Sequence, residues 1–442
     1  MNITDMSKEA LDSAWRTLQG VRLALPRHDK LLTELADADA AQTRGYYLPD
    51  EDERLREVYR QYLGARATLW QTIHDLRPHL KGEDLRIFAL AFSAASMLMR
   101  SAGFVIELAK ARPVVWAKLD EAEPRYGLPR KTFTRIYQSL SSPSWGLRYR
   151  QSRKFYEKHR TSIHKALSED RLADLIPWLE EEEPHFDARK RSLWSGIVTY
   201  RLYSLNRRTS SGYTKVMFHL FRLSGSAIAE IKQPFVKPSG SEKRVTPEVR
   251  EQIRDLLKPG DVFVTRHDDA LSNLFLPGFW PHAALYIGTP SERRELGVPD
   301  QGDDSLTVLE AKKDGVKLRQ LRETLAVDAF VVLRPKVTRE ELKAALTRAL
   351  THEGKLYDFI FDFRKSERLA CTEVVYRSFH GIGPWQLELT KRSGHLALSA
   401  EDLMQQGLAK GLFEVVLIYG VDGEVLKLSD EASQTLLATL KR

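Results

Sequence analysis

The amino-acid sequence predicts two domains: an all-α N-terminal domain, then an α+β domain with a small antiparallel sheet. The chain has 442 residues, which is too long for a single ordinary hydrophobic core. Apolar residues recur at spacings of three and four through the first half, as in amphipathic helices. Short runs rich in β-branched and aromatic residues follow in the second half, and these are typical of strands.

The domain boundaries follow from where the pattern changes. We predict a basic helical domain over residues 1–231, a linker over residues 232–248 and the α+β domain over residues 249–442. The linker "KQPFVKPSGSEKRVTPE" is rich in Pro, Gly, Ser and charged residues. After it we expect strands at "DVFVTR", "HAALYIG", "LTVLEA", "AFVVLRP" and "LFEVVLIYG". Helices are expected at "TREELKAALTRALTHEG", with Thr338 as N-cap, and at "CTEVVYRSFH".

Positive charge is concentrated in the helical domain. Residues 1–240 carry a net charge of +10 and the remainder carries −2. One short stretch interleaves Trp145, Tyr149, Phe155 and Tyr156 with the basic residues Arg148, Arg150, Arg153, Lys154, Lys158 and Arg160. Such a segment suits an anionic membrane surface, with aromatic rings at the headgroup level. Single-stranded nucleic acid is a less favoured partner, and a solvated basic face is the ordinary alternative.

Features of the sequence favour a cytoplasmic location, with peripheral binding to the inner membrane. The first residues show no basic segment followed by an apolar one, so we expect no secretory signal. The longest apolar run, Ile87–Met99, has thirteen residues, fewer than the ~18–20 that span a bilayer, so no transmembrane helix is expected. The single cysteine cannot form an internal disulfide, which fits a reducing compartment.

The common phosphate and metal signatures are absent from the sequence. It contains no GxxxxGK[ST], GxGxxG or HExxH pattern and no cysteine pair for zinc. A GxSxG elbow for a serine nucleophile is also missing. We therefore expect neither a metal nor another cofactor, and the search for a site narrows to the second domain.

Cys371 and His282 are the two candidate reactive residues of that domain. Cys371 lies where a helix is predicted to begin, and the helix dipole and free N–H groups there lower the pKa of a thiol. His282 lies at the start of the predicted strand "HAALYIG". The alternative is an inert buried thiol and an ordinary core histidine.

Six segments, in order, decide between these readings. They are "KPGDVFVTR", "WPHAALYIG", "TVLEAKKDGVKLRQL", "GKLYDFIFDF", "LACTEVVYRSF" and "HLALSAEDLMQQG". From about Lys258 to Tyr419 the chain resembles the circularly permuted papain-like cysteine hydrolases, the YiiX-like branch of the NlpC superfamily, which is related to the lecithin:retinol acyltransferase group. In this branch the histidine precedes the cysteine, as it does here. The N-terminal domain lies outside the resemblance.

The resemblance implies a role for each matching residue. Cys371 matches the nucleophile, His282 the general base and Glu310 the residue that orients the imidazole. Tyr357 matches a tyrosine near the site, with a role in substrate or oxyanion contact. A surface carboxylate at a strand end is the alternative for Glu310, because "TPSERRELGVPDQGDDS" resembles an insertion that shifts the register before it.

The reaction that these residues imply is acyl transfer through a thioester on Cys371, with water or another acceptor releasing the acyl group. The loop "LSNLFLPGFWP" places Phe279 and Trp280 beside His282, which favours a lipid-like acyl substrate at a membrane surface. Two alternatives remain open. One is a peptide amidase or endopeptidase that acts on cell-wall-type peptides as a delivered effector, and the other is a non-catalytic module that binds an anionic partner. The sequence leaves the oligomeric state undecided.

Overall fold

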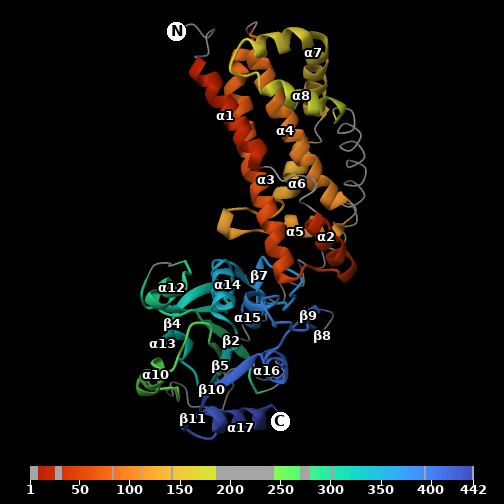
Figure 1. Cartoon of the computed structure of the whole chain (residues 1–442). Helices are drawn as coiled ribbons and strands as arrows, with labels where there is room; N and C mark the ends of the chain where they lie inside the picture. Colours follow the sequence, from red (N-terminus) through yellow and green to blue (C-terminus); the bar gives the residue numbers. More distant parts are fainter. Residues whose placement is uncertain are drawn as a thin grey trace. The chain divides into compact units, whose positions relative to one another are not determined.

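The computed structural model contains a helical region followed by an α+β region (Figure 1). The internal contacts of the chain divide it into two compact units, the first holding most residues up to 210 and the second most residues from 211 onward. The predicted fold class is confirmed. The structure describes residues 8–24, 32–81, 84–110, 112–140, 143–185, 243–268, 279–299, 303–392 and 395–440.

The first unit is built from amphipathic helices. In the described residues they are α1 (Lys8–Ala24), α2 (Leu32–Arg44), α3 (Pro49–Leu76), α4 (Leu85–Lys110), α5 (Pro113–Leu119), α6 (Thr132–Leu140), α7 (Pro143–Ser168) and α8 (Leu175–Glu182). The apolar stripes of α1, α3, α4, α7 and α8 meet in one core, in which Leu18, Leu69 and Trp178 are almost completely buried. The part of the predicted helical domain beyond residue 185 lies outside the described residues.

Helix α4 contains the longest apolar run of the chain. By length and composition, its segment Leu85–Gly103 is the one helix in the described residues that is apolar enough to cross a membrane. However, 72% of that segment is buried inside the protein. A helix that is apolar on all sides and surrounded by other helices is typical of the centre of a core.

Helix α7 carries the basic and aromatic stretch. Tyr149 and Tyr156 are buried and stack against Phe92 of α4, with ring centroids 5.9 and 5.1 Å apart. The expectation that these two rings lie at a membrane surface is therefore wrong, because the spacing of seven residues places both on the core-facing stripe. Phe155 is 39% exposed.

The second unit contains a seven-stranded antiparallel sheet in the order β11-β10-β5-β1-β2-β3-β4. The five predicted strands are all present, and the unpredicted β4 and β11 lie at the two edges. Its strands are β1 (Val262–Arg266), β2 (His282–Tyr286), β3 (Leu306–Lys312), β4 (Gly315–Gln320), β5 (Ala329–Pro335), β10 (Phe413–Tyr419) and β11 (Leu426–Leu428). Two further pairs are smaller: β6 (Leu356–Tyr357) is parallel to β7 (Arg368–Leu369), and β8 (Thr390–Arg392) is antiparallel to β9 (His395–Ala397).

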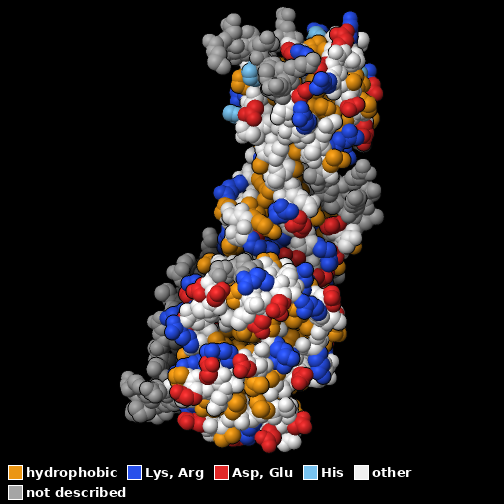
Figure 2. Space-filling view, turned by 60° about the vertical axis from the view of Figure 1, so that its left-hand side comes forward, with side chains coloured by type: hydrophobic (Ala, Val, Ile, Leu, Met, Phe, Trp, Pro, Cys, Tyr) orange, Lys and Arg blue, Asp and Glu red, His pale blue; other side chains and the backbone are white. Residues whose placement is uncertain are grey.

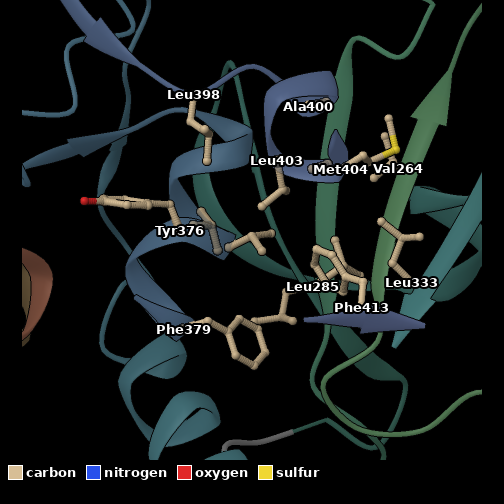
Figure 3. Packing of buried hydrophobic residues seen from close by; sticks show 14 of the residues in the cluster. Val264, Leu285, Leu333, Tyr376, Phe379, Leu398, Ala400, Leu403, Met404 and Phe413 are labelled. Carbon is tan, nitrogen blue, oxygen red and sulfur yellow. The ribbon is translucent and has the colours of Figure 1, made fainter. Parts of the chain in front are cut away.

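Side chains alternate between the two faces of the sheet along each strand, and in this sheet apolar residues occupy both faces. Val264, Leu285 and Leu333 face a core to which helices contribute Phe379 and Leu403 (Figure 3). The opposite face has a second apolar core. Within the described part of the unit, the helices are α10 (Pro247–Arg254), α12 (Pro290–Leu296), α13 (Leu321–Thr324), α14 (Arg339–Leu350), α15 (Cys371–Phe379), α16 (Ala400–Ala409) and α17 (Ser429–Thr439).

Local sequence signals account for where these elements begin. Thr338 caps α14, and its hydroxyl and backbone N–H exchange hydrogen bonds with Glu341. Helix α15 begins at Cys371, as predicted. The predicted linker extends too far, because Val245 is buried in the second unit and its N–H donates to the carbonyl of Val327. Residues 232–242 of that linker lie outside the described residues.

A buried ion pair holds the helix that carries the cysteine. Arg377 and Glu373 lie one turn apart on α15, joined at 2.7 Å, and both are almost completely buried. The guanidinium also donates to the carbonyls of Phe363 and Lys365, at 2.8 and 2.9 Å. Burial raises the pKa of Glu373, and the charge of Arg377 opposes that rise. Arg377 thus fastens α15 to the segment that precedes β7.

Replacing Arg377 with methionine is expected to destabilise the second unit by about 3 kcal/mol, because it leaves Glu373 and two carbonyl groups buried without this donor. Urea unfolding followed by tryptophan fluorescence measures the change. The matched control is Arg254→Met, which removes an exposed ion pair with Glu251 and should cost no more than about 0.5 kcal/mol. Equal effects of the two substitutions would contradict the role of Arg377.

Candidate active site

The nucleophile candidate is the first residue of a helix. Cys371 begins α15 and is 3% exposed. The backbone N–H groups of Ala283 and Thr372 donate toward its sulfur. The residue before it, Ala370, has an extended backbone, and its N–H donates to the Glu373 carboxylate at 3.3 Å. The thiol therefore lies at the positive end of the helix dipole, where a thiolate is favoured.

His282 lies between the thiol and a carboxylate. It begins β2, opposite Thr265 of β1, and its side chain is 22% exposed. Its Nε2 is 2.7 Å from Oε1 of Glu310, and its ring is also hydrogen-bonded to Cys371. Because Nε2 is used by the carboxylate, Nδ1 is the ring atom left for the sulfur. The structure thus brings together the three residues for which we predicted catalytic roles.

Glu310 is held by more than the histidine. It lies on β3 with a side chain only 1% exposed. Its second oxygen, Oε2, is 2.9 Å from Lys312 Nζ and 3.4 Å from Arg319 Nε, and it accepts a hydrogen bond from the hydroxyl of Thr324 at 3.0 Å. Three neighbours therefore hold Oε2, which leaves Oε1 for His282.

The charges of these groups shift their pKa values. Burial alone would raise the pKa of Cys371, but the positive charge and hydrogen bond of His282 lower it below its usual range. Burial opposes a charged His282, yet Cys371 and Glu310 together raise its pKa to about 10. Burial also opposes a charged Glu310, but His282 and Lys312 lower its pKa to about 2. These shifts all favour a thiolate beside an imidazolium, with an ionised carboxylate behind it.

Tyr357 lies near the thiol, at the end of β6. Its phenol is half-buried, and burial together with the negative charges of Cys371 and Asp358 raises its pKa well above its usual range. The hydroxyl therefore stays protonated and can donate a hydrogen bond.

The two aromatic residues that precede His282 are less available than predicted. Trp280 is 1% exposed, and its indole N–H donates to the hydroxyl of Thr439 at 2.9 Å. It is thus a core residue rather than a substrate-binding one, because a buried indole with its N–H satisfied packs well between sheet and helix. Phe279 is half-buried, and the guanidinium of Arg266 lies 4.4 Å from its ring centre. Residues 271–278 of the predicted acyl-binding loop lie outside the described residues.

Sequence reasoning missed the residues that hold Glu310 and a second histidine. Lys312 follows Glu310 by two positions, the spacing of one strand face, which is a signal that could have indicated it. Arg319 and Thr324 come from β4 and α13 and are brought close only by folding. His267 lies near enough to His282 to interact electrostatically, and burial together with Lys243 lowers the pKa of His267 to about 4. No group of three or more potential metal ligands occurs among the described residues.

A helix-start thiol, an imidazole and a carboxylate are the groups that papain-like cysteine hydrolases use. Residues 256–405 match the family model described as permuted papain-like amidase enzyme, YaeF/YiiX, C92 family. This segment is therefore a domain of that family, and the family of amidase enzymes indicates a cysteine hydrolase. Comparison with curated proteins and with solved structures found no match.

The pKa shifts predict how fast the thiol of Cys371 reacts in the native protein and in two variants. Cys371 of the native protein is expected to react with iodoacetamide at pH 6–7 about tenfold or more faster than a free thiol. His282→Ala removes the imidazolium and should return the reaction to that of a buried thiol. Glu310→Gln removes the charge that stabilises the imidazolium, so the pKa of His282 falls below about 10 and less thiolate forms at neutral pH.

The measurement is the alkylation rate as a function of pH, with His74→Ala, an exposed histidine of α3, as the control. We expect the order wild type, then Glu310→Gln, then His282→Ala. A thiol that reacts only after denaturation, or a Glu310→Gln profile identical to wild type, would contradict this assignment.

Proposed function

We propose that the second domain is a cysteine hydrolase or acyltransferase, with Cys371, His282 and Glu310 as its catalytic residues and a lipid-like substrate. The observation that carries this proposal is the contact of the helix-start thiol with an imidazole whose other nitrogen is bound to a buried carboxylate. An inert core cysteine is not normally found next to a histidine that is itself bound to a buried carboxylate.

The reaction follows from the positions of the atoms. The thiolate of Cys371 attacks an amide or ester carbonyl, and the backbone N–H of Cys371, free at the helix start, is placed to stabilise the oxyanion. Collapse of the tetrahedral intermediate breaks the bond to the leaving group, which takes its proton from His282. Water or another acceptor then gives a proton to His282 and attacks the thioester, which restores the thiolate–imidazolium pair. Glu310 keeps the ring oriented and stabilises it while it is charged.

The substrate is the less constrained part of the proposal. The family description names amidase enzymes, which favours an amide bond. Because peptides also contain amide bonds, a peptide amidase is the second candidate function. We favour an acyl amide or ester because the half-buried ring of Tyr357 lies near the thiol, and because the half-buried Phe279 comes three residues before His282.

Turnover of acyl amides and acyl esters by the purified protein is the direct test. Cys371→Ala and His282→Ala are each expected to lower kcat/KM by about a thousandfold or more, because one lacks the nucleophile and the other the base. Glu310→Gln should retain part of the activity. Hydroxylamine added to the reaction tests for acyl transfer. It takes up the acyl group only if an acceptor other than water can reach the thioester. Cleavage of peptide amides with no cleavage of acyl substrates would favour the peptide amidase instead.

We also propose that the helical unit binds an anionic membrane surface, as a peripheral protein of the cytoplasm. Helix α7 exposes Arg148, Arg150, Lys154 and Lys158. The other two basic residues of the stretch are ion-paired, Arg153 with Glu157 and Arg160 with Glu180 and Glu183. Acidic and basic side chains are interspersed over the face seen in Figure 2, so the attraction would come from this local stretch rather than from a uniformly positive surface.

Co-sedimentation with vesicles tests the membrane proposal. Binding is expected to anionic phosphatidylglycerol vesicles but not to neutral phosphatidylcholine vesicles, and to weaken as salt is added. Replacing the four exposed basic residues of α7 with glutamine should lower the partition coefficient by about tenfold or more, since each contributes ~1 kcal/mol near the surface. The control replaces Lys313 and Lys317, two exposed lysines of the second unit. Equal binding to both kinds of vesicle, or equal loss in both variants, would contradict the proposal.

A further inference from the structure

The loop that follows Tyr357 buries its two carboxylates more completely than its three apolar side chains. Asp358 and Asp362 are 5% and 4% exposed, whereas Phe359, Ile360 and Phe361 are only half-buried. Folding normally selects the reverse arrangement, because burying a carboxylate costs free energy and exposing an aromatic ring forgoes burial. This loop reverses that arrangement, which indicates that its partly exposed apolar side chains are available to bind a ligand.

The loop is held in one conformation by its two buried carboxylates. Asp358 accepts the backbone N–H groups of Ile360 and Asp362, at 3.0 and 2.6 Å. Asp362 in turn binds the guanidinium of Arg364 at 2.6 Å. Phe361 is held at a φ of 56°, a left-handed conformation that costs a bulky residue about 1–2 kcal/mol and that glycine would adopt freely. The ring held in this way packs against the apolar core of the unit and against Tyr357.

The position of the loop relates it to the nucleophile. Strands β6 and β7 run parallel, with Tyr357 opposite Leu369, and the N–H of Asp358 donates to the carbonyl of Leu369 at 3.1 Å. Because Cys371 comes two residues after Leu369, the loop leaves β6 beside the start of α15. The Tyr357 ring, which lies near the thiol, packs edge-on against Phe359 and Phe361, with centroids 4.9 and 6.3 Å apart.

We propose that Phe359, Ile360 and Phe361 form an apolar wall beside Cys371 that receives the acyl chain of the substrate. This inference rests on the proposed acyl-transfer function and adds the residues that would select the chain. An acyl chain fits better than a bilayer as the occupant, because the three side chains are half-buried and two of them lie against Tyr357. Side chains that enter a bilayer project from the surface more fully.

The test measures kcat/KM for p-nitrophenyl esters with acyl chains of two, four, eight and twelve carbons. For the wild type we expect kcat/KM to rise with chain length, because each buried methylene contributes to binding. Phe359→Ala and Ile360→Ala should lower the ratio of the octanoate to the acetate value by about fivefold to tenfold. Phe359→Leu keeps an apolar side chain and should restore much of that ratio.

Two controls distinguish the possible failures. Leu437→Ala removes an apolar side chain of α17 that is 48% exposed, and it should leave the chain-length dependence unchanged. The iodoacetamide rate of Cys371 shows whether each loop variant keeps its active site intact. If no ester is cleaved by any form of the protein, the proposed function fails. If esters are cleaved but the loop variants keep the wild-type ratio, or lose activity equally on all chain lengths, the wall is overturned while the proposed function stands.

Discussion

The contact between His282 and the buried carboxylate of Glu310 is the interaction on which the site depends. A carboxylate that is 1% exposed is costly unless charged partners surround it, and here Lys312, Arg319, Thr324 and His282 do so. Once Oε2 is occupied by three neighbours, Oε1 is directed at the imidazole. The ring then has one orientation, and its remaining nitrogen faces the thiol.

A second constraint places the thiol where that nitrogen can reach it. The pair Glu373–Arg377 lies inside α15 and ties this helix to the carbonyls of Phe363 and Lys365. The residues that lead into the helix are paired with β6, whose last residue is Tyr357. Cys371, the nearby tyrosine and the apolar loop are thus fixed by one small set of hydrogen bonds. This set is separate from the large sheet that carries His282 and Glu310.

The two units of the chain have different physical characters. The helical unit buries its aromatic residues, as Tyr149 and Tyr156 show, and presents basic side chains on α7. The second unit uses its buried charged residues in pairs around the candidate site. Acyl chemistry at a membrane would need both properties, one to bring the protein to the surface and the other to carry out the reaction.

The sequence by itself determined the class of fold, and it predicted which two residues form the reacting pair. Periodicity identified the helices and the five central strands because burial of one helix stripe or one strand face imposes those spacings. The order of His282 and Cys371, together with the segments around them, indicated a permuted papain-like domain. Glu310 was also named, but only through resemblance, because a carboxylate at a strand end has no local feature that distinguishes a buried orienting group from a solvated one.

Tertiary structure alone decided which neighbours those residues have. Arg319 and Thr324 reach Glu310 from β4 and α13, and contacts between elements leave no periodic trace in the sequence. Trp280 comes only two positions before His282, yet it is buried in the core, where its indole N–H donates to Thr439, a residue of the distant helix α17. The apolar loop after Tyr357 was visible as "DFIFDF", but which of its side chains are buried depends on the hydrogen bonds of Asp358 and Asp362. Such bonds form only once the chain has folded around them.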